Sequence, residues 1–167
     1  MQHLLVPYDF KDTAHGALDV AFGLAKKLGA RITLLYVAHT ETVTEAFFGL
    51  NAVRYLSSTL ERDEDDAPAP ALAFDALIAT AQGKLEDVVP LEWKDSVDFD
   101  AKVVDGRPAD VIVDYAREHD VDMIVMGTHG RGAVGHLFLG SVAENVVRTA
   151  LCPVLTVRHP VGDEAKR

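Results

Sequence analysis

The sequence predicts an α/β protein in which one open, five-stranded parallel sheet carries helices on both faces. Short apolar runs alternate with longer segments whose apolar residues recur at helical spacing. Parallel strands need long crossover connections, and the helical segments supply them. The chain has 167 residues, 49% of them hydrophobic, which is enough for a single domain with a substantial core.

The first two predicted strands flank one amphipathic helix. Residues 4–6 and residues 31–37 are short apolar runs of the kind that form buried parallel strands. Between positions 14 and 28, alanines and leucines repeat at intervals of three and four residues, which predicts a helix. We expect Asp12 or Thr13 to cap the start of this helix and Gly29 to end it in the left-handed conformation.

Residues 38–98 break the simple alternation. A helical face predicts one long helix there, formed by Leu72, Leu77, Ile78, Ala81, Leu85 and Val88. Residues 40–70 lack such a pattern and are expected to form a mobile excursion. The acidic run at 61–66 does not match a calcium-binding loop, because Pro68 stands where that loop needs glycine and Phe74 where it needs glutamate. We therefore interpret this run as a solvated linker.

The second half of the chain returns to alternating elements. Strands are predicted at 100–104, 121–126 and 153–157, and Pro108 is expected in the first turn of the helix after the first of these. Ser141 and Glu144 match a capping box, which places the start of another helix at or beside Ser141. Because ligands of open parallel sheets bind beyond the carboxyl ends of the strands, we expect the functional site on the loops that follow them.

Composition narrows the classes of partner. The formal net charge is −10 and the isoelectric point is near 5.0, whereas nucleic acids and anionic membranes need a cationic surface. No leader pattern and no apolar run of about 18 residues is found in the sequence, so we expect a cytoplasmic protein without a membrane span. The single cysteine, Cys152, is consistent with a reducing compartment and is interpreted as a small packed hydrophobic residue.

Histidine spacing gives no metal site. A zinc site uses two histidines four residues apart or a partnership with cysteine, and no such arrangement occurs among His3, His15, His39, His119, His136 and His159. We interpret these histidines as surface or packing residues.

A glycine-rich loop follows the predicted strand at 121–126. Five glycines lie within the fourteen residues that begin at Gly127, and they remove the Cβ atoms that would keep a ligand away from the backbone. The helix expected at Ser141 would direct its first N–H groups and the positive end of its dipole into this loop. A tight turn needs only one or two glycines, so this pattern favours a phosphate-binding loop.

Two better-known nucleotide motifs describe this loop poorly. Residues 130–135 match the letters G-x-G-x-x-G, but they follow the fourth strand, and the position about twenty residues later is Leu155 instead of an acidic residue. Residues 135–141 resemble a P-loop only superficially, because they lack the lysine that reaches the terminal phosphates.

The remaining pattern is Gly127-x2-Gly130-x9-Gly140-Ser141 after a strand that ends at Met126. This pattern resembles the ATP-binding signature of the universal stress protein family. The resemblance extends from residues 4–9 through 34–37 and 104–108 to 152–157. It implies a Rossmann-like fold of the adenine nucleotide alpha hydrolase type with strand order 3-2-1-4-5, a domain over residues 1–159 and a short polar tail over 160–167.

Carried over residue by residue, the resemblance implies an ATP site on four loops. Its nucleotide-binding residues would be Pro7, Tyr8, Asp9, Val37, Met126, Gly127, His129, Gly130, Arg131, Gly140, Ser141 and Val142. Asp9 and the backbone of Val37 would face the adenosine, and backbone N–H groups of the glycine loop would face the phosphates, which would also hold Mg²⁺. Two residues have alternative interpretations: Asp9 as the cap of a turn, and Arg131 as a solvated loop residue.

The resemblance implies a nucleotide-dependent regulatory or stress-response protein, paired as a homodimer through its last strand. The alternative is a weak ATPase or nucleotidyl-transfer enzyme on the same architecture. No catalytic residue is assigned, because the loop has neither a P-loop lysine, nor an H-x-G-H pattern, nor an obvious base to position water. A third interpretation is a dimeric scaffold whose nucleotide site is vestigial.

Overall fold

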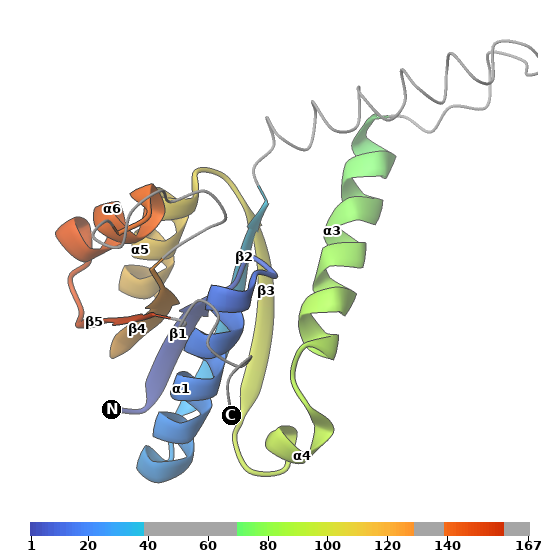
Figure 1. The fold of residues 1–167 in the computed structure, drawn as a ribbon. Helices are drawn as coiled ribbons and strands as arrows, with labels where there is room; N and C mark the ends of the chain where they lie inside the picture. The colour runs from blue at the N-terminus through green and yellow to red at the C-terminus, as the bar shows by residue number, and fades with distance from the viewer. Residues whose placement is uncertain (39–69, 129–138, 159–167) are drawn as a thin grey trace, which may run out of the picture.

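A computed structural model describes residues 1–38, 70–128 and 139–158, and the side chains of 70–77 are left out of the description. Five parallel strands form one sheet in the order β3-β2-β1-β4-β5 (Figure 1). The strands are β1 (His3–Pro7), β2 (Arg31–Ala38), β3 (Phe99–Asp105), β4 (Met123–Gly127) and β5 (Val154–Val157). The predicted fold class and strand order are confirmed, and each predicted strand lies within two residues of an observed one.

Helices cover both faces of the sheet, as predicted. Helices α1 (Asp12–Leu28) and α3 (Pro70–Asp87) pack on one face, and α5 (Pro108–Glu118) and α6 (Ser141–Thr149) pack on the other (Figure 1). A single turn of helix, α4 (Leu91–Lys94), was not predicted. Its Trp93 stacks on Phe22 of α1 with a centroid distance of 4.0 Å, so α4 closes the end of that layer.

The central strand β1 divides the core into two clusters. Leu4 and Val6 face α1, whereas Leu5 faces α5 and α6, and all three side chains are fully buried. A strand that is covered on both faces needs a continuous apolar run instead of an alternating one, which is the pattern of residues 4–6. Cys152 packs at the margin of the second cluster, and burial raises the pKa of its thiol, in agreement with the packing role.

Two of the predicted helix starts are wrong in detail. The N-cap of α1 is Lys11, in an extended conformation, and neither Asp12 nor Thr13 caps the helix. The N-cap of α6 is Gly140, and no side chain caps that helix, so the capping box expected from Ser141 and Glu144 is absent from it. Ser141 is nevertheless the first helical residue, as predicted.

Other helix boundaries follow the sequence signals. Pro108 occupies the first turn of α5, where its missing N–H costs nothing. Gly29 ends α1 with a φ of 66°, a left-handed conformation that glycine adopts without steric cost. The long helix predicted between 72 and 88 is confirmed as α3. The acidic run at 61–66, most of the glycine loop (129–138) and the tail lie outside the described residues.

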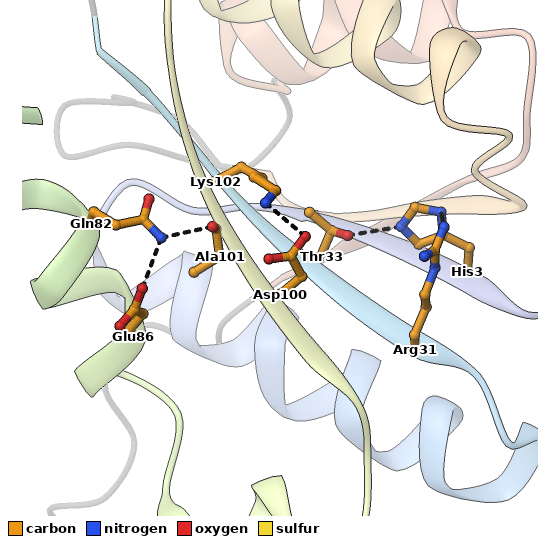
Figure 2. A network of polar contacts seen from close by, with 8 residues as sticks. All are labelled: His3, Arg31, Thr33, Gln82, Glu86, Asp100, Ala101 and Lys102. Carbon is orange, nitrogen blue, oxygen red and sulfur yellow. Dashed lines mark hydrogen bonds and ion pairs between the residues drawn. The ribbon is translucent and has the colours of Figure 1, made fainter. Parts of the chain in front are cut away.

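Polar contacts lie along β1, β2 and β3 toward the end of the sheet opposite the carboxyl edge (Figure 2). The ring of His3 lies 2.8 Å from the Thr33 hydroxyl through Nε2 and 3.1 Å from the Arg31 guanidinium through Nδ1. Burial, and secondarily the charge of Arg31, lowers the pKa of His3, so its ring is neutral near pH 7. His3 is thus a packing residue, as interpreted from its spacing.

Within the described residues, no group of three or more histidine, cysteine, aspartate or glutamate side chains is placed to hold a metal ion. No helix in the same part of the chain combines the length and apolarity needed to cross a membrane.

Candidate functional site

A cleft of about 340 Å³ opens at the carboxyl ends of β1, β2 and β4, between the first turns of α1, α5 and α6. This volume falls in the range of small-molecule sites. Nine of the residues that the family resemblance implies line the cleft: Pro7, Tyr8, Asp9, Val37, Met126, Gly127, Gly140, Ser141 and Val142. The other three, His129, Gly130 and Arg131, lie outside the described residues. The fold therefore brings together at one edge residues from widely separated parts of the chain.

The backbone of Val37 faces the cleft with both a donor and an acceptor. Odd-numbered residues of β2 bond toward β1, because Arg31 N–H donates to the Gln2 carbonyl and the Leu35 carbonyl accepts from Tyr8 N–H at 2.9 Å. The N–H and C=O of one strand residue point the same way and alternate along the strand, so those of Val37 also point toward β1. Strand β1 ends at Pro7, and no described backbone group bonds Val37 on that side. The N–H and C=O of Val37 thus give the cleft a backbone donor and a backbone acceptor that lie next to each other.

Asp9 follows the end of β1 and is held by Lys11. The Lys11 N–H donates to Asp9 Oδ1 at 3.2 Å, and the Lys11 ammonium donates to Oδ2 at 2.6 Å. The alternative interpretation of Asp9, as the acceptor of a turn, therefore describes its contacts in this structure. A carboxylate has further lone pairs, so these two bonds leave acceptor capacity for a ligand.

Gly127, at the end of β4, allows the first turn of α1 to approach the sheet. A Cβ at this position would lie 2.7 Å from the Thr13 carbonyl oxygen and 2.9 Å from the Thr13 Cβ. Real Cβ atoms do not approach that closely, so only glycine permits this junction. The cleft wall between α1 and β4 depends on it.

The start of α6 presents backbone donors to the cleft. The first intrahelical bond runs from the Glu144 N–H to the Gly140 carbonyl at 2.9 Å. The N–H groups of Ser141, Val142 and Ala143 therefore have no acceptor within the helix. All three residues line the cleft. The Gly140 N–H, expected from the resemblance to face phosphate, instead donates to the Thr128 carbonyl at 2.6 Å. That bond fixes the start of α6 against the end of β4.

The side chain of Tyr8 is buried in the core at the cleft. It packs in the cluster beneath α1, and within the described residues its buried hydroxyl has no hydrogen-bond partner. Burial raises the pKa of this phenol, with smaller effects from the charges of Asp9 and Asp19. The Tyr8 N–H donates to the Leu35 carbonyl, which ties the chain after β1 to β2 beside the cleft.

Sequence reasoning missed part of the lining. Lys11 and Thr13 from the start of α1, and Pro108 and Ile112 from α5, also line the cleft. Pro108 carried a signal, because a helix that begins after a parallel strand directs its N-terminus to the same edge as the ligand site. For Lys11 the sequence signal was weaker: it stands only two residues after Asp9, which was itself a predicted site residue.

Comparisons with known proteins agree on one family. The model of the universal stress protein family matches residues 1–158. A universal stress protein of Thermus aquaticus, from the 3′ region of the QAH/OAS sulfhydrylase gene, is 38% identical over 157 residues, covering 93% of this chain and 97% of that protein. The solved structure of MJ0577 from Methanocaldococcus jannaschii superposes with a TM-score of 0.70 at 26% identity, covering 96% of this chain and 98% of that one.

Two more distant structures of the same fold hold adenine nucleotides. A universal stress protein from Archaeoglobus fulgidus, solved in complex with dAMP, is 21% identical with a TM-score of 0.57 and coverages of 93% and 97%. Another universal stress protein, solved in complex with cAMP, is 22% identical with a TM-score of 0.56 and coverages of 94% and 96%. At these identities the likeness to this chain is one of fold.

Proposed function

We propose that this chain, which belongs to the universal stress protein family, binds ATP in the cleft and acts as a nucleotide-dependent regulatory protein of the stress response. The observation that carries the proposal is the convergence of complementary groups in one cleft. A backbone donor and acceptor at Val37 lie at the end of β2, and the N–H groups of α6 that have no acceptor within the helix begin at Ser141.

Each end of the cleft suits one part of the nucleotide. Adenine carries an amino donor beside a ring-nitrogen acceptor, which complements the carbonyl and N–H of Val37. The first N–H groups of α6, together with the positive end of its dipole, suit phosphate oxygens. Met126 and Gly127 line the cleft at the end of β4, and ribose and the α-phosphate would run along them. Mg²⁺, when bound, would be held through the phosphates and would offset their charge.

The proposal predicts that Ser141→Glu abolishes ATP binding while the protein stays folded. A carboxylate in the first turn of α6 stabilises the helix, by about 0.3–1 kcal/mol, yet occupies the place of a phosphate with like charge. Ser141→Gln is the matched control, because it has the same size without the charge. Calorimetric titration of Mg-ATP into protein stripped of nucleotide should give saturable binding for the wild type, weakened binding for Ser141→Gln and none for Ser141→Glu.

The same titration distinguishes the alternatives. Gly130→Glu, which places a charge in the glycine loop itself, should behave like Ser141→Glu. Recovery of intact ATP from the complex supports a binding protein, whereas rapid turnover that is lost in His129→Ala or Arg131→Ala supports the enzyme alternative. Absence of binding by the wild type would overturn the proposal and favour the scaffold.

We also propose that the protein is cytoplasmic and forms a homodimer through β5. This strand lies at the edge of the sheet beside β4, and an open edge offers backbone groups to a second copy. Light scattering coupled to size-exclusion chromatography should therefore give twice the chain mass of 18.1 kDa. A mass of one chain at all concentrations would contradict the dimer without affecting the nucleotide proposal.

A further inference from the structure

The described lining of the cleft contains one cationic and one anionic side chain, and these two are paired with each other. Lys11 Nζ lies 2.6 Å from Asp9 Oδ2, and both side chains are about half exposed, at 46% and 48%. Every other described residue of the lining is uncharged. The side-chain charge of this part of the cleft therefore comes from one ion pair.

The turn that brings Lys11 back to Asp9 is held in an unusual conformation. Phe10, between them, has a φ of 59°, in the left-handed region that side-chain-bearing residues rarely adopt. Its ring packs on Tyr8 and Tyr36, with centroid distances of 5.4 and 5.2 Å. Aromatic packing thus maintains a backbone conformation that is unfavourable by itself, and it keeps Lys11 at the mouth of the cleft.

The position of Lys11 is electrostatically unfavourable without an anion. Lys11 is the N-cap residue of α1, and its carbonyl accepts the Ala14 and His15 N–H groups. The positive end of the α1 dipole disfavours a cation there, Asp9 pairs with the ammonium, and Asp12 in the first turn of α1 adds a second negative charge. A half-exposed ion pair of this kind is weak, so a second anion can replace Asp9 at little cost.

We propose that Lys11 exchanges Asp9 for a phosphate group when a nucleotide binds, and so makes the cleft select phosphorylated ligands over nucleosides. This inference rests on the proposed nucleotide site and specifies how that site recognises charge. Lys11 would donate to a phosphate oxygen through its flexible four-carbon stem. Asp9 Oδ2 would then accept a hydrogen bond from the ribose or the base. The phosphate would thus gain a partner in Lys11, and the nucleoside part of the ligand would gain one in Asp9.

The test compares the affinity of ATP with that of adenosine, measured by calorimetry for the wild type and for Lys11→Met. Loss of a charge-assisted hydrogen bond should weaken ATP binding about tenfold. Adenosine binding should be unchanged or stronger, because Asp9 is no longer occupied by the ammonium. The ratio of the two affinities should therefore fall by about tenfold or more, and Lys11→Arg should restore it.

Lys102→Met is the matched control. Lys102 forms a similar half-exposed pair with Asp100, also two residues away, at 3.1 Å, and it lies on β3 outside the cleft lining (Figure 2). Removing this charge lowers the net charge of the protein by the same amount as Lys11→Met. The ATP-to-adenosine ratio should stay at the wild-type value.

The outcomes separate this inference from the function on which it rests. If the wild type binds ATP and Lys11→Met keeps the wild-type ratio, the inference is wrong and the nucleotide site stands. An equal loss of ATP and adenosine binding would also overturn it, because that is the signature of a structural defect. If the wild type binds neither ligand, both proposals fail.

Discussion

Replacing Gly127 with alanine is expected to lower the free energy of unfolding by roughly 1–3 kcal/mol. The added Cβ would lie 2.7 Å from the Thr13 carbonyl oxygen and 2.9 Å from the Thr13 carbonyl carbon. These are backbone atoms in the first turn of α1, and they cannot rotate away as the end of a long side chain can. The helix must move away from β4, and urea unfolding of the variant measures the cost.

The same displacement should weaken nucleotide binding, because Thr13 and Gly127 line the cleft side by side. Gly23→Ala provides the control within the same helix. Apart from its chain neighbours and the backbone of its own helix, no atom of the described residues lies within 4 Å of a Cβ added at Gly23, and alanine is the better helix former by about 0.8–1 kcal/mol. Gly23→Ala should therefore stabilise the protein. Equal stability of Gly127→Ala and the wild type would show that α1 and β4 are not in contact in solution.

Replacing Leu5 with alanine is expected to have the largest effect on stability, a loss of about 2–5 kcal/mol. Leu5 lies in β1, the central strand, and none of its surface is exposed. Its neighbours from β2, β4, α5 and α6 are held in place by the sheet and cannot collapse into the cavity that alanine would leave. Since domains of this kind are stable by only about 5–15 kcal/mol, chemical denaturation should detect the change readily.

Leu91→Ala is the matched control for that loss. It removes the same atoms from a side chain that is 79% exposed, at the start of α4. The free energy of unfolding should change by no more than about 0.5 kcal/mol. A comparable effect at both positions would contradict the assignment of Leu5 to the core.

Local sequence patterns predicted the sheet well because buried parallel strands must be apolar on both faces. Residues 4–6 and 121–126 are such runs. The helical segments that separate the predicted strands are long enough to serve as crossover connections, which indicates that the strands are parallel. Gly29 and Pro108 were informative for a similar reason, since each suits a backbone geometry that few other residues adopt as well. The strand order came from the family resemblance.

Helix starts were predicted less well. Ser141 and Glu144 have the letters of a capping box, but the residue in the N-cap position is Gly140, whose N–H bonds the Thr128 carbonyl. At α1, the turn through Phe10 makes Lys11 the N-cap ahead of Asp12. In both cases the way in which the chain leaves the preceding strand decides which residue comes first, and a short motif does not encode that path.

By itself, the sequence determined the fold class, the approximate extent of the strands and the presence of a glycine-rich loop, because these depend on apolar periodicity and on residues with special backbone freedom. The tertiary structure alone decided that Gly127 touches Thr13, that Val37 directs its N–H and C=O past the end of β1, and that Lys11 pairs with Asp9 at the mouth of the cleft. The first two depend on how separate segments pack against each other. The third depends on a left-handed turn that packing maintains.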